Sequence, residues 1–295
     1  MKNKEIIELI IFSLKQLNKK EINKLVPISF KEKKIGWINS ENFDLIKKNF
    51  EVKDSDILNL KYLFSSNSKW QNKILDLAIK SNLINEKYTE SCPIFFYEAL
   101  NPKTNFSDTE IFGERKLFDI NRGLMSFFGF PTYGVHCNGW VIEEKKIYIF
   151  LSKRSQKLIT FPSLYDNLIG GGQPSDISLK DNLLKEGFEE VGLSENVLFD
   201  ASFNTFTKYS HTHNGELNSS VIATYDLELS GDFIFRGKDG EVEKVEKFEI
   251  LEIFYLLEKN QIKPNCIIPI INFMLMKMPK FFNKNSLLEI KKYLT

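Results

Sequence analysis

The sequence predicts an α+β protein in which helices cover a mixed β-sheet. Helix-type spacing of apolar residues fills the first part of the chain, whereas β-rich runs begin at Thr132 and are interrupted by a helix-type segment at 179–191. The 295 residues exceed what one compact core usually needs. We therefore expect a smaller α+β domain at 1–125, a sandwich domain at 126–285 and the end of a C-terminal helix at 286–295.

The N-terminal part is predicted to be mainly helical. A strand is expected at 34–38, where a glycine and a tryptophan break the helical pattern. Turn residues predict a loop at 101–108, and a further helix is expected at 115–128, ended by Gly129. The other segments with helical spacing are 2–18, 40–50, 54–64 and 69–82.

The second part of the chain is predicted to form the sheet. The β-rich runs 135–142 and 146–152 are joined by a short polar tip, which predicts a hairpin. Further strands are expected at 218–229 and 242–251, with helices near the C-terminus. The polar stretch Tyr209–Gly215, which holds two histidines, is interpreted as a turn between strands.

The composition excludes several classes of protein. Lys and Arg number 40 against 39 Asp and Glu, so the formal net charge of +1 attracts neither nucleic acid nor an anionic membrane. The longest apolar run, 266–276, is too short to span a bilayer, and the run 6–14 has the spacing of an amphipathic helix. Free thiols suit a reducing compartment, so a cytoplasmic location is expected. The cysteines are too far apart in sequence to suggest a metal-ligand cluster: Cys92, Cys137 and Cys266.

One contiguous segment carries the chemistry. Three glycines, Gly170–Gly172, allow a ligand to approach the backbone closely, and Ser178 is a candidate N-cap for the helix that follows. That helix places Glu186, Glu189 and Glu190 on one face, where their carboxylates repel one another. A solvated acidic face is the plain interpretation. The glycine turn opposite favours a site for Mg²⁺, which prefers hard oxygen ligands and leaves positions open for phosphate and water.

This segment resembles the signature box of the Nudix hydrolases. The box reads Gly, five residues, Glu, seven residues, Arg-Glu, an apolar residue, any residue, Glu-Glu, any residue, Gly and an apolar residue. With Gly171 as its first position, the positions in register are Glu186, Glu189, Glu190, Gly192 and Leu193. Three positions depart from the box: Ile177 replaces its first Glu, Lys185 its Arg, and Gly187 an apolar residue. These departures touch the loop–helix geometry and leave the metal-binding glutamates intact.

The resemblance extends to one branch, the thiamine-diphosphate-type Nudix hydrolases, which includes the N-terminal half of fungal thiamine pyrophosphokinase. Motif agreement covers about 122 to 275, and over 1–121 only the layout is similar. The resemblance implies an α/β/α sandwich with a mixed sheet behind a smaller α+β domain. The runs that carry it are 128–130, 134–140, 151–157, 161–168, 225–229, 239–243 and 263–266.

The resemblance also implies roles on the metal side of the site. Glu186 and Glu190 would be the principal ligands of Mg²⁺, for which Mn²⁺ can substitute, and Glu189 a further or water-mediated one. The backbone at Gly171 would contribute a carbonyl. The general base would be Glu241, with Glu243 as the competing candidate and a solvated turn residue as the plain alternative.

On the substrate side, the resemblance points to the cationic loop after the second strand. Arg154 is the first candidate for phosphate binding, since its guanidinium can grip two oxygens. Asn138 shares a strand face with His136, for which a hydrogen-bonded core role is favoured over a catalytic one. The remaining candidates for substrate binding are Lys153, Lys157 and Asn167.

The expected function is Mg²⁺-dependent hydrolysis of a small-molecule diphosphate. Thiamine diphosphate or its oxidised analogues, cut to the monophosphate and phosphate, is the first hypothesis. Another nucleoside-diphosphate-type substrate and a catalytically silent ligand sensor remain open. An activity like that of isopentenyl diphosphate isomerase is a further alternative, for which Cys137 would have to reach the cleft. The N-terminal part would form one wall of the site or a structural cap, and the sequence leaves the oligomeric state open.

Overall fold

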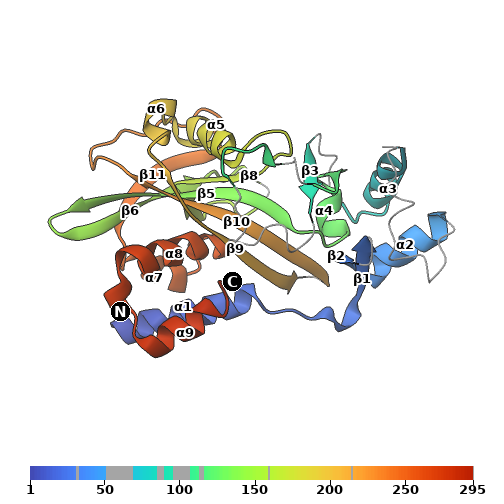
Figure 1. Cartoon of the computed structure of the whole chain (residues 1–295), viewed down its shortest axis with the longest axis horizontal. Helices are drawn as coiled ribbons and strands as arrows, with labels where there is room; N and C mark the ends of the chain where they lie inside the picture. The colour runs from blue at the N-terminus through green and yellow to red at the C-terminus, as the bar shows by residue number, and fades with distance from the viewer. Residues whose placement is uncertain are drawn as a thin grey trace.

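The computed structural model (Figure 1) describes residues 1–30, 33–50, 69–84, 90–95, 107–112, 116–158, 160–213 and 215–294. The helix predicted at 54–64 and most of the loop predicted at 101–108 lie outside the described residues. No helix among the described residues is both long and apolar enough to cross a membrane.

A seven-stranded sheet forms the centre of the molecule. The strand order is β11-β6-β5-β10-β9, with β7 paired to β6 and β8 paired to β5. β5 and β10 run parallel, whereas the other pairings are antiparallel, so the sheet is mixed and the α+β fold class is confirmed. The strands are β5 (Thr132–Glu143), β6 (Lys146–Arg154), β7 (Tyr165–Asn167), β8 (Ile169–Gly172), β9 (Ser202–His213), β10 (Glu216–Glu228) and β11 (Val242–Glu249).

Helices cover both faces of this sheet (Figure 1). Because strand side chains alternate between faces, Val135 and Cys137 of β5 enter one core together with Leu183 of α5, whereas Trp140 enters the other core with Phe273 of α8. The first face carries α5 (Leu179–Val191) and α6 (Glu195–Leu198). The second carries α7 (Ile253–Glu258), α8 (Ile267–Lys277), α1 (Asn3–Leu17) and α9 (Lys284–Lys291), with short 3-10 turns at Pro264–Cys266 and Pro279–Phe281; a further 3-10 turn, Ile22–Lys24, follows α1 in the chain.

The remaining N-terminal elements have a core of their own. Two small antiparallel pairs, β1 with β2 and β3 with β4, pack with the helices around residues such as Ile35, Leu75 and Ile120. Helix α1 instead shares the core of α8, through Ile6, Ile10 and neighbours. The division of the chain at residue 125 stays a prediction. Helix α1 belongs to the predicted N-terminal domain by sequence but packs in the core of the sheet domain. The elements are β1 (Leu25–Phe30), β2 (Lys33–Asn39), α2 (Ser40–Phe50), α3 (Lys69–Lys80), β3 (Ser91–Ile94), β4 (Phe118–Asn121) and α4 (Leu124–Phe127).

Two local predictions were wrong. The helix expected at 115–128 is a strand, β4, followed by the single turn of α4, because residues 118–121 pair with β3 and bury Ile120. Most of the turn expected at Tyr209–Gly215 belongs to β9, which pairs along its length with β10. In both cases pairing with a partner strand decided the backbone conformation: β3, earlier in the chain, pairs with β4, and β10, the next strand of a hairpin, pairs with β9. The predicted hairpin is confirmed, and Glu144 and Lys145 form its turn with φ of 47° and 66°.

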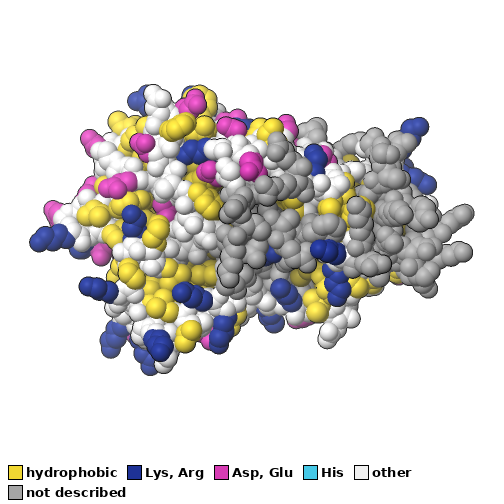
Figure 2. All heavy atoms as spheres, viewed as in Figure 1, with side chains coloured by type: hydrophobic (Ala, Val, Ile, Leu, Met, Phe, Trp, Pro, Cys, Tyr) yellow, Lys and Arg dark blue, Asp and Glu magenta, His cyan; other side chains and the backbone are white. Residues whose placement is uncertain are grey.

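The surface carries charges of both signs (Figure 2). In this view basic side chains gather along the lower edge, where α1 and α9 lie side by side (Figures 1 and 2). Lys15 of α1 pairs there with Glu289 of α9 at 3.6 Å, and Glu289 pairs with Lys292 at 2.6 Å. Such exposed pairs contribute little to stability.

Candidate active site

A cavity of about 740 Å³ opens beside the glycine strand β8. It brings together residues from β5, β6, β8, α5, the loop before β11 and the turn before α8. Glu186, Glu189 and Glu190 of α5 form what we call the acidic wall, with Lys185 among them. Arg154 and Lys263, which both bind Asp166, form what we call the basic wall. The charged residues in its lining are Glu90, Arg122, Arg154, Lys157, Lys185, Glu186, Glu189, Glu190, Asp239, Glu241 and Lys263.

Helix α5 is fixed against β8 at both ends. The Ser178 hydroxyl accepts the backbone N–H of Asp181, which confirms the predicted N-cap, and Gly192 ends the helix in the left-handed region with φ of 70°. Asn182 donates to the carbonyl of Gly172 at 2.9 Å. At Gly187 an added Cβ would lie 2.7 Å from Leu198, so this helical glycine allows close packing. The glutamates of α5 therefore face β8 at a fixed distance.

The three glutamates of α5 differ in exposure. Glu190 is buried, with 6% of its surface exposed, and accepts the Gly170 N–H at 2.9 Å. Burial raises the pKa of Glu190 to about 8, and the hydrogen bond from Gly170 opposes that shift. Burial also raises the pKa of Glu186, while Lys185 lowers it. Lys185 lies 3.1 Å from both Glu186 and Glu189, so it offsets part of their mutual repulsion.

Gly171 provides space that a larger residue would fill. A Cβ added at Gly171 would lie 2.3 Å from Cγ of Glu186, so the Glu186 side chain lies directly across the glycine backbone. The carboxylates of Glu186 and Glu190 face the glycine backbone, and Glu189 lines the same cavity; all three are hard oxygen donors of the kind that Mg²⁺ and Mn²⁺ bind. The residues present thus fit a divalent cation at this position.

The basic side of the cavity is built on a buried carboxylate, Asp166 of β7. Its Oδ2 accepts from Arg154 Nη1 at 3.1 Å and from Lys263 Nζ at 2.8 Å. Its Oδ1 accepts from the backbone N–H of Asn167 at 2.9 Å and from the thiol of Cys266 at 2.6 Å. Burial alone would raise the pKa of Asp166, but the charge of Lys263 and the other contacts hold it below its usual value. Asp166 is therefore an ionised, fully hydrogen-bonded anchor.

His136 completes this cluster from β5. His136, Asp166 and Cys266 offer ligand atoms within 4.8 Å of one another, all buried. The Lys263 ammonium already binds the carboxylate, so a metal cation there would meet a competing positive charge. His136 Nδ1 lies 2.9 Å from Asn167 Oδ1, a carbonyl oxygen that only accepts, so Nδ1 carries the hydrogen. Burial lowers the pKa of His136 to about 4, so the ring is neutral.

Several predicted site residues lie outside the cavity lining. Asn138 and Asn167 are buried below it, where Asn167 donates to Asn138 Oδ1 at 3.2 Å and Asn138 donates to Asp226 at 2.9 Å. Lys153 places its ammonium 4.3 Å from the centre of the Tyr165 ring. Neither these three residues nor the fully buried Cys137 is among the described residues that line the cavity.

Glu241 does lie at the cavity, on the loop before β11, whereas Glu243 is not among the lining residues of the described chain. The backbone N–H of Glu241 donates to Asp239 Oδ1 at 2.8 Å, and its carbonyl accepts the Ser155 N–H at 2.7 Å. This loop is thereby tied to the cationic loop after β6.

Two cations at the cavity were missed by sequence reasoning. Lys263 stands in the run 263–266, which carries part of the family resemblance, and no local signal distinguishes it from a surface lysine. Arg122 comes from the N-terminal part, where it pairs with Glu90 at 2.6 Å. Its Nη2 would be 3.4 Å from a Cβ at Gly172, so Arg122 lies over the glycine strand. Residues that flank or belong to the β3–β4 pair therefore contribute to the lining of the cavity.

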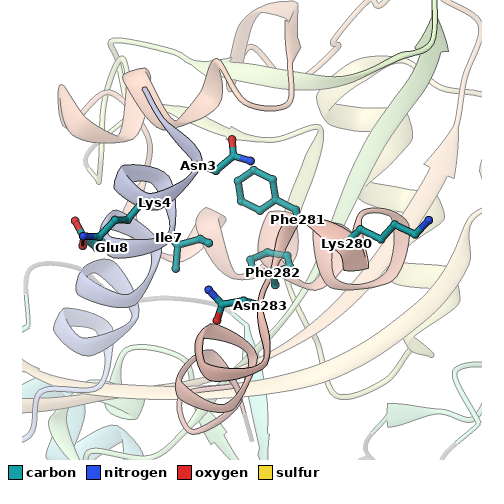
Figure 3. Close-up of a pocket in the computed structure, with 8 residues that line it drawn as sticks. All are labelled: Asn3, Lys4, Ile7, Glu8, Lys280, Phe281, Phe282 and Asn283. Carbon is teal, nitrogen blue, oxygen red and sulfur yellow. Dashed lines mark ion pairs between the residues drawn. The ribbon is translucent and has the colours of Figure 1, made fainter.

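A second hollow, of about 430 Å³, lies where α1 meets the segment before α9. Figure 3 shows Ile7, Phe281 and Phe282 around it. Its Lys4 and Glu8 form an exposed surface pair at 3.8 Å. We therefore place the chemistry in the larger cavity.

Comparison with known proteins supports the Nudix hydrolase superfamily. The chain is 34% identical over 158 residues to Nudix hydrolase 20, chloroplastic, and 32% identical over 171 residues to Nudix hydrolase 24, chloroplastic, both from Arabidopsis thaliana. These alignments cover 53% and 55% of the chain, but only 42% and 45% of the relatives, so the chain matches less than half of their length. No protein-family model matches.

Among solved structures, the chain is similar to the Nudix domain of NrtR from Shewanella oneidensis, crystallised with ADP ribose. The two share 14% sequence identity at a TM-score of 0.41, over 50% of this chain and 90% of that one.

Proposed function

We propose that the protein is a Mg²⁺-dependent Nudix-type hydrolase that cleaves a diphosphate, with thiamine diphosphate or its oxidised analogues as first candidates. One observation carries the proposal: the carboxylates of Glu186 and Glu190 lie against the glycine strand β8, in a cavity that Arg154 and Lys263 also line. The thiamine assignment rests on the resemblance of the sequence to that branch.

In this proposal Glu186 and Glu190 hold the cation, with Glu189 as a further ligand and the Gly171 carbonyl beside them. The bound cation would neutralise phosphate charge and lower the pKa of a water molecule. Glu241 accepts the proton of the attacking water, since it lines the same cavity and its backbone is fixed by two hydrogen bonds. As the water oxygen bonds to phosphorus, the bond to the bridging oxygen breaks, and the monophosphate leaves with that electron pair.

The N-terminal part, 1–125, is proposed to contact the organic group of the substrate. Glu90, Cys92 and Arg122 line the cavity, and Arg122 lies over Gly172 of the glycine strand. Such a wall would select among diphosphates that share the same phosphate chemistry. In this proposal the sheet domain binds the phosphates, and the organic group of the substrate lies between the two parts of the chain.

The test is phosphate release by the full chain from thiamine diphosphate, its oxidised analogues and a panel of nucleoside diphosphate derivatives, with and without Mg²⁺. Release from the thiamine compounds that requires both Mg²⁺ and Glu190 is the expected result. Release from the nucleoside panel alone would retain the hydrolase and reject the thiamine assignment. Metal binding without any turnover would support a ligand sensor, and a rearranged diphosphate product an isomerase.

A further inference from the structure

The basic side of the cavity has donors that the protein itself leaves available. The Lys263 ammonium has three N–H donors, and within the described residues one hydrogen bond is formed, to Asp166. Arg154 has five, and three are used: Nε with the Phe161 carbonyl, Nη2 with Thr160 and Nη1 with Asp166. Both side chains line the cavity, with 16% and 12% of their surfaces exposed. Their remaining donors are therefore at its wall.

Hydrogen bonds hold these two cations in place at the cavity wall. Arg154 is fixed at three points, and Lys263 is fixed through its backbone as well, since its N–H donates to the Tyr165 carbonyl at 2.9 Å. The Asp166 side chain that joins them is buried, with 4% of its surface exposed, so it anchors both cations from inside the protein. A preorganised donor pair loses little conformational entropy on binding, which favours affinity.

The charges at this wall leave a surplus for an anion. Asp166 contributes one negative charge between two positive ones, so the cluster of Arg154, Asp166 and Lys263 carries one net positive charge, given that His136 is neutral. The acidic wall of α5 excludes an anion unless a cation is present there. An anionic group in the cavity is thus drawn to the Arg154–Lys263 wall.

We propose that Arg154 and Lys263 form an anion subsite for the terminal phosphate group of the substrate, and that Asp166 is the positioning residue that holds both cations at the cavity wall. The ligand class is a phosphate or diphosphate group. The inference deepens the proposed function and rests on it for the identity of the phosphate as part of a substrate.

The experiment measures binding of imidodiphosphate, a diphosphate that resists hydrolysis, to the full chain with saturating Mg²⁺ by titration calorimetry. Lys263→Met is expected to raise Kd about 10- to 100-fold, as loss of a charge-assisted hydrogen bond predicts. Lys263→Arg is expected to recover part of the loss. Lys259→Met is the matched control, because Lys259 is exposed at the end of α7 and outside the cavity lining, and its Kd should equal that of the unmodified protein. A Kd unchanged in Lys263→Met would overturn the subsite.

The positioning role of Asp166 is tested by a double-mutant cycle. If Asp166 positions Lys263, the substitution Lys263→Met should weaken binding little further once Asp166→Asn is present, so the combined variant should bind about as well as Asp166→Asn alone. Additive losses would overturn the positioning role. Should Asp166→Asn fail to fold, the comparison of Lys263→Met with Lys259→Met, both checked by thermal unfolding, still decides the subsite.

The outcome is separable from that of the hydrolase proposal. Tight imidodiphosphate binding that depends on Lys263, without release of phosphate from any organic diphosphate, would keep the subsite and reject the hydrolase. Phosphate release from an organic diphosphate, together with imidodiphosphate binding that does not depend on Lys263, would keep the hydrolase and reject the subsite.

Discussion

The two walls of the cavity are built in different ways. The acidic wall comes from one contiguous segment, in which β8 and α5 follow each other and Glu190 accepts the N–H of Gly170. The basic wall comes from β6, β7 and the turn before α8, and its central contact joins Asp166 to Lys263, 97 residues further along the chain. The acidic wall is a local motif with a repulsive charge pattern. The basic wall is a tertiary cluster with its charges paired.

This difference predicts different responses to mutation. In the proposed function the acidic wall concentrates like charges to hold a metal, so removing one of its carboxylates should affect function and cost little stability. The basic wall contains a buried ion cluster, so removing its central carboxylate should affect stability as well as function. The experiments below compare the two walls on these terms.

The largest effect is expected at the acidic wall. Glu190→Gln should lower Mg²⁺-dependent phosphate release about 1000-fold, about 4 kcal/mol in the barrier, because a charged metal ligand is lost. Its thermal unfolding midpoint should not fall, since Gln can still accept the Gly170 N–H without a buried charge. Glu195→Gln, at an exposed position of α6, is the control and should leave both quantities unchanged. A large loss of stability in Glu190→Gln would show that the wall is structural.

At the basic wall, Asp166→Asn should destabilise the protein by about 3 kcal/mol, because two cations lose their buried counter-charge. Urea unfolding measures this change, and Asp200→Asn, at an exposed position after α6, provides the comparison. A destabilisation no larger than that of Asp200→Asn would remove the contrast between the walls.

Acid should weaken the basic wall through His136. The folded pKa is lowered from 6.5 to about 4, so the unfolded chain binds the proton more readily. Stability from this group is complete above pH 6.5 and is lost as pH falls toward 4, by about 2 kcal/mol between pH 7 and 4.5. The test is the difference in unfolding free energy between the unmodified protein and His136→Gln at both pH values. Subtracting the two unfolding free energies cancels the contribution of other titrating groups, such as Glu190. The remaining stability advantage of the unmodified protein should be smaller at pH 4.5 than at pH 7.

The smallest effect concerns the backbone of the acidic wall. Gly171→Ala should lower phosphate release about tenfold, about 1.4 kcal/mol, because the new methyl group would lie 2.3 Å from Glu186 Cγ and displace that side chain. Gly172→Ala is the matched control one residue along, where the nearest atom is Arg122 Nη2 at an ordinary 3.4 Å. Equal rates of phosphate release for the two variants would contradict the inference that Glu186 needs the open space beside Gly171.

The elements that the sequence predicted well are those with a local cause. The bounds of α5 follow from the Ser178 cap and the left-handed Gly192, and the hairpin of β5 and β6 follows from two alternating runs beside a tight turn. The glutamate spacing needs only the helical period to place the three side chains on one face. None of these features depends on a residue far along the chain.

The tertiary structure decided the rest. Strand β4 forms where a helix was expected because β3, earlier in the chain, pairs with it. Asn138 and Asn167, expected at the substrate, are buried among their own hydrogen bonds. Lys263 reaches Asp166 because Tyr165 pairs with Gln261 and Lys263 through backbone hydrogen bonds at 2.8 and 2.9 Å. Such a pairing leaves no periodic signal, since any residues can form it, so only the folded chain brings that lysine to the cavity.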